Sequence, residues 1–142
     1  VGDGLGVAVR AHPHRRHPRQ VFEVLAGVEH AQGDHVLARA LAQATGFAHC
    51  TPVGMHLHPG MPVAAEWLRA GMWVSDVVYL PVDTELIVAA RDRGCAVVDG
   101  GTMAVGQAVD AFGLLTGRPA DAGRMRRHFL ELVAAQSTGR GA

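Results

Sequence analysis

Three short loops of this chain carry residue types from which a ligand crevice could be built. They begin at Thr51, Tyr79 and Gly100, and each follows a short apolar run typical of a β-strand. In an open α/β sheet, the loops at the carboxyl ends of parallel strands line the crevice that binds ligands. The three loops are therefore predicted to lie side by side and to form one binding site.

The first loop offers shape rather than reactive groups. Pro52 follows Thr51 and forces an extended turn, and Gly54 allows the backbone to approach a flat ligand closely before Met55 closes the segment. Taken alone, the segment fits an ordinary strand-exit loop equally well.

The second and third loops add polar and polarizable side chains. Tyr79 can present its hydroxyl at a strand end while its ring packs, the alternative being a core or interface tyrosine. Gly100 leaves open backbone near the amide-rich start of a helix. Met103 can lie against a ring, although a core position is the alternative. Gln107 offers a donor and an acceptor to a polyhydroxylated ligand, but taken alone it fits a solvent-facing side chain.

Histidines and cysteines do not form a recognisable catalytic or metal site. His12, His14 and His17 are separated by prolines that fix no common face for metal ligands, so a basic arm is favoured. His56 and His58 are interpreted as loop surface, with a crevice-facing role for one of them left open. No Ser/His/Asp or Cys/His arrangement is present, and the sequence predicts no catalytic residue and no metal.

The elements that position these loops alternate between helix and strand. Helices are predicted at 36–41, 64–68, 83–93, 101–116 and from 121 onward, and strands at 47–50, 72–78 and 95–98. This alternation predicts an α/β fold with a parallel sheet and right-handed crossovers. The nearly continuous apolar run at 72–78 predicts a strand covered on both faces.

Composition and charge narrow the class of protein. A chain of 142 residues, 49% of them apolar, suits one domain with an ample core. Thirteen basic residues, all arginine, balance thirteen acidic ones, so neither nucleic acid nor an anionic membrane is expected as a partner. No apolar run reaches the roughly 18–20 residues that span a bilayer, and no signal-peptide pattern opens the chain. A cytoplasmic protein is expected, with Cys50 and Cys95 as buried thiols.

Together the three loops resemble the C-terminal, nucleotide-binding half of the shikimate/quinate dehydrogenase family. Residues 49–55 are similar to the family segment Asn-Ala-Thr-Pro-x-Gly-Met, with His49 in the place of its asparagine. The family pattern Gly-x-x-Met-x-x-x-Gln matches Gly100, Met103 and Gln107, which favours a functional role for the glutamine. The resemblance covers about residues 36–134 and implies a partial Rossmann-like (doubly wound) parallel sheet with flanking helices and a C-terminal helix.

The resemblance implies an activity and assigns site residues. Family members reversibly reduce 3-dehydroshikimate or dehydroquinate with NADP or NAD, and here Tyr79 and Gln107 would face the substrate. The remaining assignments are cofactor contacts, namely Thr51, Pro52, Gly54, Met55, Val77, Gly100, Met103, Gly4, Gly6 and Glu23. Glu23, if it meets a ribose hydroxyl, would favour NAD.

The resemblance also divides the chain. Residues 1–35 would be an irregular or degraded start of the dinucleotide-binding domain, 36–136 its Rossmann-like C-terminal half, and 137–142 a frayed tail. Gly4 and Gly6 could be the remnant of a phosphate-cradling turn, but prolines at 13 and 18 forbid the helix that such a turn must open.

Two function classes follow. The family's proton transfer uses a lysine and an aspartate of an N-terminal substrate domain, and this chain contains no lysine, so the pair is assigned to no residue here. The chain is expected either to be the cofactor-side part of such a dehydrogenase, inactive without a missing N-terminal partner, or to be a non-catalytic remnant or nucleotide-binding module.

Overall fold

The computed structural model describes residues 6–12, 21–25 and 34–138. Its elements, in chain order, are β1 (Gly6–His12), β2 (Val21–Leu25), α1 (Asp34–Gln43), β3 (Gly46–His49), the 3-10 turn η1 (Ala65–Trp67), β4 (Trp73–Asp76), α2 (Glu85–Asp92), β5 (Ala96–Val98), α3 (Gly100–Thr116) and α4 (Ala122–Thr138). Every helix and strand predicted after residue 35 is therefore present, with ends shifted by a few residues.

The five strands form one mixed sheet in the order β2-β1-β3-β4-β5. Strands β3, β4 and β5 are parallel, as predicted, but β1 pairs antiparallel with both β2 and β3. The predicted parallel sheet is thus confirmed for the three strands after residue 35, and β1 and β2, for which no parallel pairing was predicted, extend it as antiparallel strands. The link at residues 13–20 is shorter than the dozen or so residues that a parallel crossover needs, so β1 and β2 can pair only as a hairpin.

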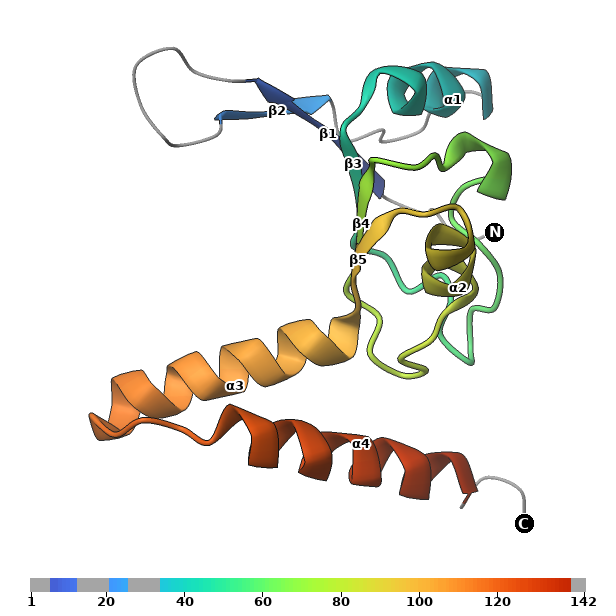
Figure 1. Cartoon of the computed structure of the whole chain (residues 1–142). Coiled ribbons are helices and arrows are strands. Elements are labelled where there is room, and N and C mark those ends of the chain that lie inside the picture. Colours follow the sequence, from blue (N-terminus) through green and yellow to red (C-terminus); the bar gives the residue numbers. More distant parts are fainter. Residues whose placement is uncertain (1–5, 13–20, 26–33, 139–142) are drawn as a thin grey trace.

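Helices cover one face of the sheet within the described part of the chain. Helices α1 and α2 and the turn η1 lie on the same side of it, while α3 leaves the end of β5 and α4 returns antiparallel beside it (Figure 1). The core on the covered face contains Phe47 and Val74 from the strands, together with Leu41, Ala44, Val63, Leu68, Met72, Leu86, Ala90 and Cys95.

The opposite face of the parallel strands remains open among the described residues. Trp73 is half-buried there, and Val77 and Val98 are 40% and 43% exposed. Burial in β4 consequently alternates, which is the pattern of a strand covered on one side. The expected cover on both faces of residues 72–78 is not found.

The side chain of Arg69, in the loop after η1, forms hydrogen bonds with the backbone at the end of α1. The Arg69 guanidinium donates to the carbonyl oxygens of Leu41, at 2.7 Å, and Ala44, at 2.5 Å. These carbonyls lie at the end of α1, where helix oxygens lack partners within the helix. One planar side chain therefore satisfies both and joins two segments of the core.

Replacing Arg69 with methionine should lower the free energy of unfolding by about 1–3 kcal/mol, since hydrogen bonds to a charged donor are lost while the apolar stem is kept. Urea denaturation followed by circular dichroism measures the change. Arg39→Met, on the surface of α1, is the matched control; an equal loss in both variants would contradict the role given to Arg69.

The two cysteines are free and differ in exposure. Cys95 is buried, as expected, and its Sγ lies 3.3 Å from the carbonyl oxygen of Arg69. Burial raises the pKa of the Cys95 thiol above its usual range. Cys50 is exposed, which corrects the expectation of a buried thiol: its neighbours His49 and Thr51 are the buried residues at the end of β3.

At neutral pH, Cys50 should react with a chromogenic disulfide reagent at least about a hundredfold faster than Cys95, because burial and the raised pKa leave little reactive thiolate at Cys95. Stopped-flow absorbance should resolve two phases of equal amplitude, and Cys50→Ser should abolish the fast one. Two fast phases would show that Cys95 is accessible.

Candidate functional site

The three loops predicted to form the site follow neighbouring strands. His49 of β3 pairs with Asp76 of β4, and Ser75 of β4 pairs with Val98 of β5. Because the strands are parallel, their carboxyl ends lie at one edge of the sheet, and the loops that leave them begin side by side. The predicted position of the three loops at one edge of the sheet is confirmed, and their forming one binding site stays a prediction.

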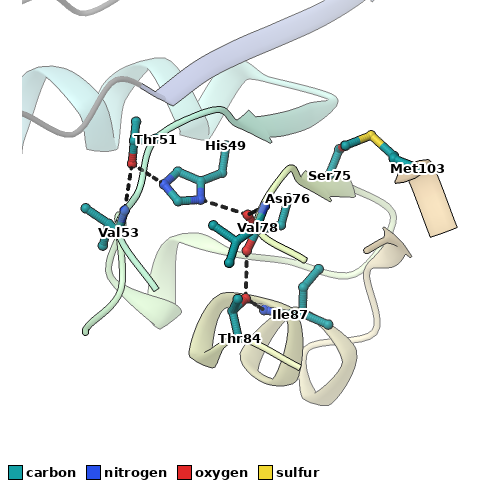
Figure 2. Close-up of polar contacts among 9 residues, drawn as sticks. All are labelled: His49, Thr51, Val53, Ser75, Asp76, Val78, Thr84, Ile87 and Met103. Atoms are coloured by element: carbon teal, nitrogen blue, oxygen red, sulfur yellow. Dashed lines mark hydrogen bonds and ion pairs between the residues drawn. The ribbon is translucent and has the colours of Figure 1, made fainter. Parts of the chain in front are cut away.

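A buried carboxylate stands at the centre of this edge. Asp76, with no exposed surface, accepts hydrogen bonds on Oδ1 from His49 Nδ1 and from the Val78 backbone N–H, both at 3.0 Å. Its Oδ2 accepts from the Thr84 hydroxyl at 2.6 Å (Figure 2). Thr84 in turn accepts the Ile87 N–H at 3.2 Å and so caps α2.

The same network continues into the loop after β3. His49 Nε2 lies 2.5 Å from the Thr51 hydroxyl, whose oxygen accepts the Val53 N–H at 3.3 Å. A carboxylate can only accept, so the ring donates from Nδ1 to Asp76. With Nε2 accepting from Thr51, every hydrogen bond in the network has one donor and one acceptor, and no buried side-chain nitrogen or oxygen of the described residues lacks a partner.

The third loop is held by close backbone packing. A Cβ added at Gly100 would lie 2.3 Å from the carbonyl oxygen of Val78 and 2.7 Å from that of Val77. Only glycine permits this approach, because no side-chain atom can occupy that space. Asp99 then caps α3 by accepting the Thr102 N–H at 2.7 Å. The start of α3 is thus pressed against the loop after β4.

The residues assigned to the first loop occupy different environments. The Thr51 side chain faces inward to His49, whereas Pro52 and Met55 are exposed. Gly54 adopts φ +97°, which favours glycine, and its Cα side packs against Thr84, so that an added Cβ would lie 3.4 Å from the threonine Cβ. That distance is an ordinary van der Waals contact, so the backbone conformation and not close packing accounts for glycine at position 54.

The residues assigned to the other two loops are only partly brought together. Tyr79, 53% exposed, and Val77 lie next to Gly100 in space. Met103 is half-buried and accepts a hydrogen bond from Ser75 at 3.7 Å, which places it against β4. Gln107 is exposed on α3, about 10 Å along the helix from Gly100 but on the same side of it.

Of the assignments in the first 35 residues, Gly6 lies at this edge of the sheet and Glu23 lies away from it. Gly6 begins β1 opposite His49 and lies in a strand, so the phosphate-cradling turn expected there is not found at Gly6. Glu23 lies on the outer strand β2 opposite Arg10, and β1 separates it from β3. Gly4 lies outside the described residues. The ligand contacts proposed for all three stay predictions.

Sequence reasoning missed the polar network. The motif at residues 49–55 presents His49 only as a replacement for the family asparagine, and no local pattern pairs Asp76 with His49 or with Thr84. The available signal was their position: polar residues at the ends of apolar strands must find hydrogen-bond partners when they are buried.

Among the described residues no group of three or more His, Cys, Asp or Glu side chains is arranged to hold a metal ion.

A groove in the described part of the chain lies away from the strand ends. It has a volume of about 450 Å³, lies between α3 and α4, and is lined in part by Phe112, Met125 and His128. None of the predicted site residues lines it, so it is not part of the candidate site.

None of the described helices has both the length and the apolar character needed to cross a membrane.

Comparison with known proteins identifies what this edge of the sheet is similar to. No protein-family model matches the sequence. Over 100 residues, 70% of its length, the chain is 58% identical to the shikimate dehydrogenase (NADP(+)) of Pseudarthrobacter chlorophenolicus, of which it covers 34%. The matched part is the C-terminal part of these relatives. The chain is homologous to the C-terminal part of shikimate and quinate dehydrogenases.

Solved structures agree with the sequence match. The quinate dehydrogenase of Corynebacterium glutamicum in complex with NAD aligns with a TM-score of 0.65 at 46% identity, over 69% of this chain and 35% of that one. The shikimate 5-dehydrogenase of Listeria monocytogenes, in complex with shikimate and NAD, aligns with a TM-score of 0.61 at 28% identity, over 68% and 34%. The predicted Rossmann-like α/β class is confirmed, and the chain spans about a third of the length of these relatives.

Substituting Gly100 with alanine should destabilise the protein by about 1–3 kcal/mol, because the new methyl group would overlap the carbonyl oxygen of Val78. Gly106→Ala, on the same helix with open space around the added methyl, should instead stabilise by about 0.5–1 kcal/mol. Thermal unfolding of both variants tests the contrast. A neutral Gly100→Ala would show that α3 does not press against the loop after β4.

Proposed function

We propose that the loops at the ends of β3, β4 and β5 form the cofactor side of a shikimate or quinate dehydrogenase and bind NADP or NAD. The observation that carries the proposal is the shared edge where Asp76 and Gly100 hold the three loops together. Relatives matching this part of the chain are named as NADP(+) enzymes or crystallised with NAD. The proposed contacts are those already named at these loops: Thr51, Pro52, Gly54, Met55, Val77, Gly100 and Met103.

The fit to a flat nicotinamide ring rests on this chain's own surfaces. Val77 and Tyr79 are 40% and 53% exposed at the end of β4, beside the point where the buried backbone of Gly100 packs against the Val78 carbonyl. They form an exposed apolar edge against which a flat ring could lie. When bound, the cofactor supplies the hydride that reduces the ketone of the substrate. In the proposal Tyr79 and Gln107 face that substrate, of the shikimate or quinate class, and orient its hydroxyl groups.

A further part of the protein is proposed to supply the proton donor. The chain has no lysine, and the proposal gives no described residue the role of acid or base. Exposed apolar surface supports a partner domain: Val77 and Val98 lie on the open sheet face, and Leu114 and Leu115 of α3 are 87% and 86% exposed. An N-terminal substrate domain, joined or separate, would cover part of this surface. A cytoplasmic location is proposed with it.

Calorimetric titration of the purified chain with NADP⁺ and with NAD⁺ tests the proposal. We expect saturable binding of at least one cofactor and no oxidation of shikimate by the chain alone, because the proton donor is missing. Adding the N-terminal two thirds of the Corynebacterium glutamicum enzyme should restore turnover. Robust turnover without it would disprove the assignment of the donor to another domain.

The alternative is a non-catalytic remnant or nucleotide-binding module with the same fold. The placement of Gly6 in strand β1, where a phosphate-cradling turn was expected, is the observation that favours it. Flat titrations with both cofactors, together with no turnover after complementation, would select the remnant. Binding without restored turnover would select the nucleotide-binding module.

A further inference from the structure

We infer that His49 is a positioning residue that sets the distance between the loop after β3 and the loop after β4. The imidazole has no exposed surface and contacts one loop with each nitrogen: Nδ1 lies 3.0 Å from Asp76 Oδ1, and Nε2 lies 2.5 Å from Thr51 Oγ1 (Figure 2). The consequence for cofactor binding rests on the proposed function, whereas the positioning itself does not.

Each nitrogen of the ring binds a side-chain oxygen that also accepts a hydrogen bond from a loop amide. On one side Thr51 Oγ1 accepts the N–H of Val53, and on the other Asp76 Oδ1 accepts the N–H of Val78. The ring is planar and rigid, so the spacing of its two nitrogens is constant. A single side chain thereby links the backbone of the loop after β3 to that of the loop after β4.

The same contacts reach the start of α3 and the start of α2. The carbonyl of Val78 is the atom that Gly100 approaches, and the Thr84 hydroxyl on Asp76 also caps α2. A shift of the His49 ring would therefore move the exposed residues Val77 and Tyr79 relative to the loop after β3. His49 is buried, so it would act on the ligand through these loops and without touching it.

The test uses a variant that removes the contact of residue 49 with Thr51 and keeps its contact with Asp76. In His49→Asn the side-chain amide can still donate near the position of Nδ1, but it is too short to reach Thr51. Thr51→Val removes the same contact from the other end with little change in shape. Hydrogen exchange of the Val53 and Val78 amides, followed by NMR on the whole chain, reports the two loops separately.

We expect both variants to speed exchange at Val53 about tenfold or more and to leave Val78 within about twofold, with His56→Ala, an exposed histidine of the same loop, changing neither. Equal loosening of both amides would mean that His49 merely fills space, and no change at Val53 would mean that it fixes nothing. Either result overturns the inference. Thr51→Val removes the acceptor of the Val53 N–H itself, so it serves as the reference for complete loss of that hydrogen bond. If His49→Asn fails to fold, His49→Gln decides, because its longer amide can reach Thr51 but not Asp76. Faster exchange at Val78 with Val53 unchanged is then expected, and unchanged exchange at Val78 overturns the inference.

The second measurement is the dissociation constant for NADP⁺ or NAD⁺. His49→Asn should weaken binding about tenfold while His56→Ala stays within twofold, because a buried side chain can affect affinity only through the loops it holds. Unchanged affinity together with faster exchange at Val53 would overturn the link between His49 and the cofactor site. If the native chain binds neither cofactor, the proposed function fails, and the exchange at Val53 still tests the positioning.

Discussion

The structure depends on satisfying one buried carboxylate. An ionised Asp76 without exposed surface would be strongly unfavourable unless several donors surrounded it. The three donors come from three different segments: a ring nitrogen at the end of β3, a backbone amide just after β4, and the hydroxyl that caps α2. Because the carboxylate requires them together, the ends of these segments are held in one arrangement, and the loops of the candidate site leave from it.

Close packing of glycine complements the polar network. The loop after β4 meets the start of α3 where Gly100 has no side chain, so two backbones lie in contact at the place where an exposed tyrosine leaves the strand. Hydrogen bonding therefore fixes two walls of the candidate site and steric contact fixes the third. The two mechanisms share Val78, whose N–H binds Asp76 and whose carbonyl meets Gly100.

The described part of the chain leaves one sheet face open. Apolar residues of β4 and β5 are accessible there, and α3 carries leucines that contact little of the rest of the protein. The chain matches only about a third of the length of its relatives, so this surface agrees with the proposal that a further domain completes the enzyme. The antiparallel strands β1 and β2 extend the sheet on the side away from β5.

Much of the fold after residue 35 could be predicted, since apolar periodicity and glycine or proline punctuation are local signals. The strand predicted at 47–50 and the helices predicted at 83–93 and 101–116 all follow from such patterns, with their ends shifted by a residue or two. The same reasoning did not reveal that β1 pairs antiparallel with β2 and β3, because pairing is set by contacts between segments and not by a local pattern. It also failed for the cover of β4, because an apolar run does not reveal whether a second layer is present.

The sequence by itself determined which loops would meet, because parallel strands place their carboxyl ends at one edge, and it determined the residue types available there. Only the tertiary structure decided that Asp76 would bind His49, 27 residues before it, and Thr84, 8 residues after it. Such pairings depend on strand register and on the depth of burial. Both are set by contacts between distant segments, which no local pattern of residues encodes.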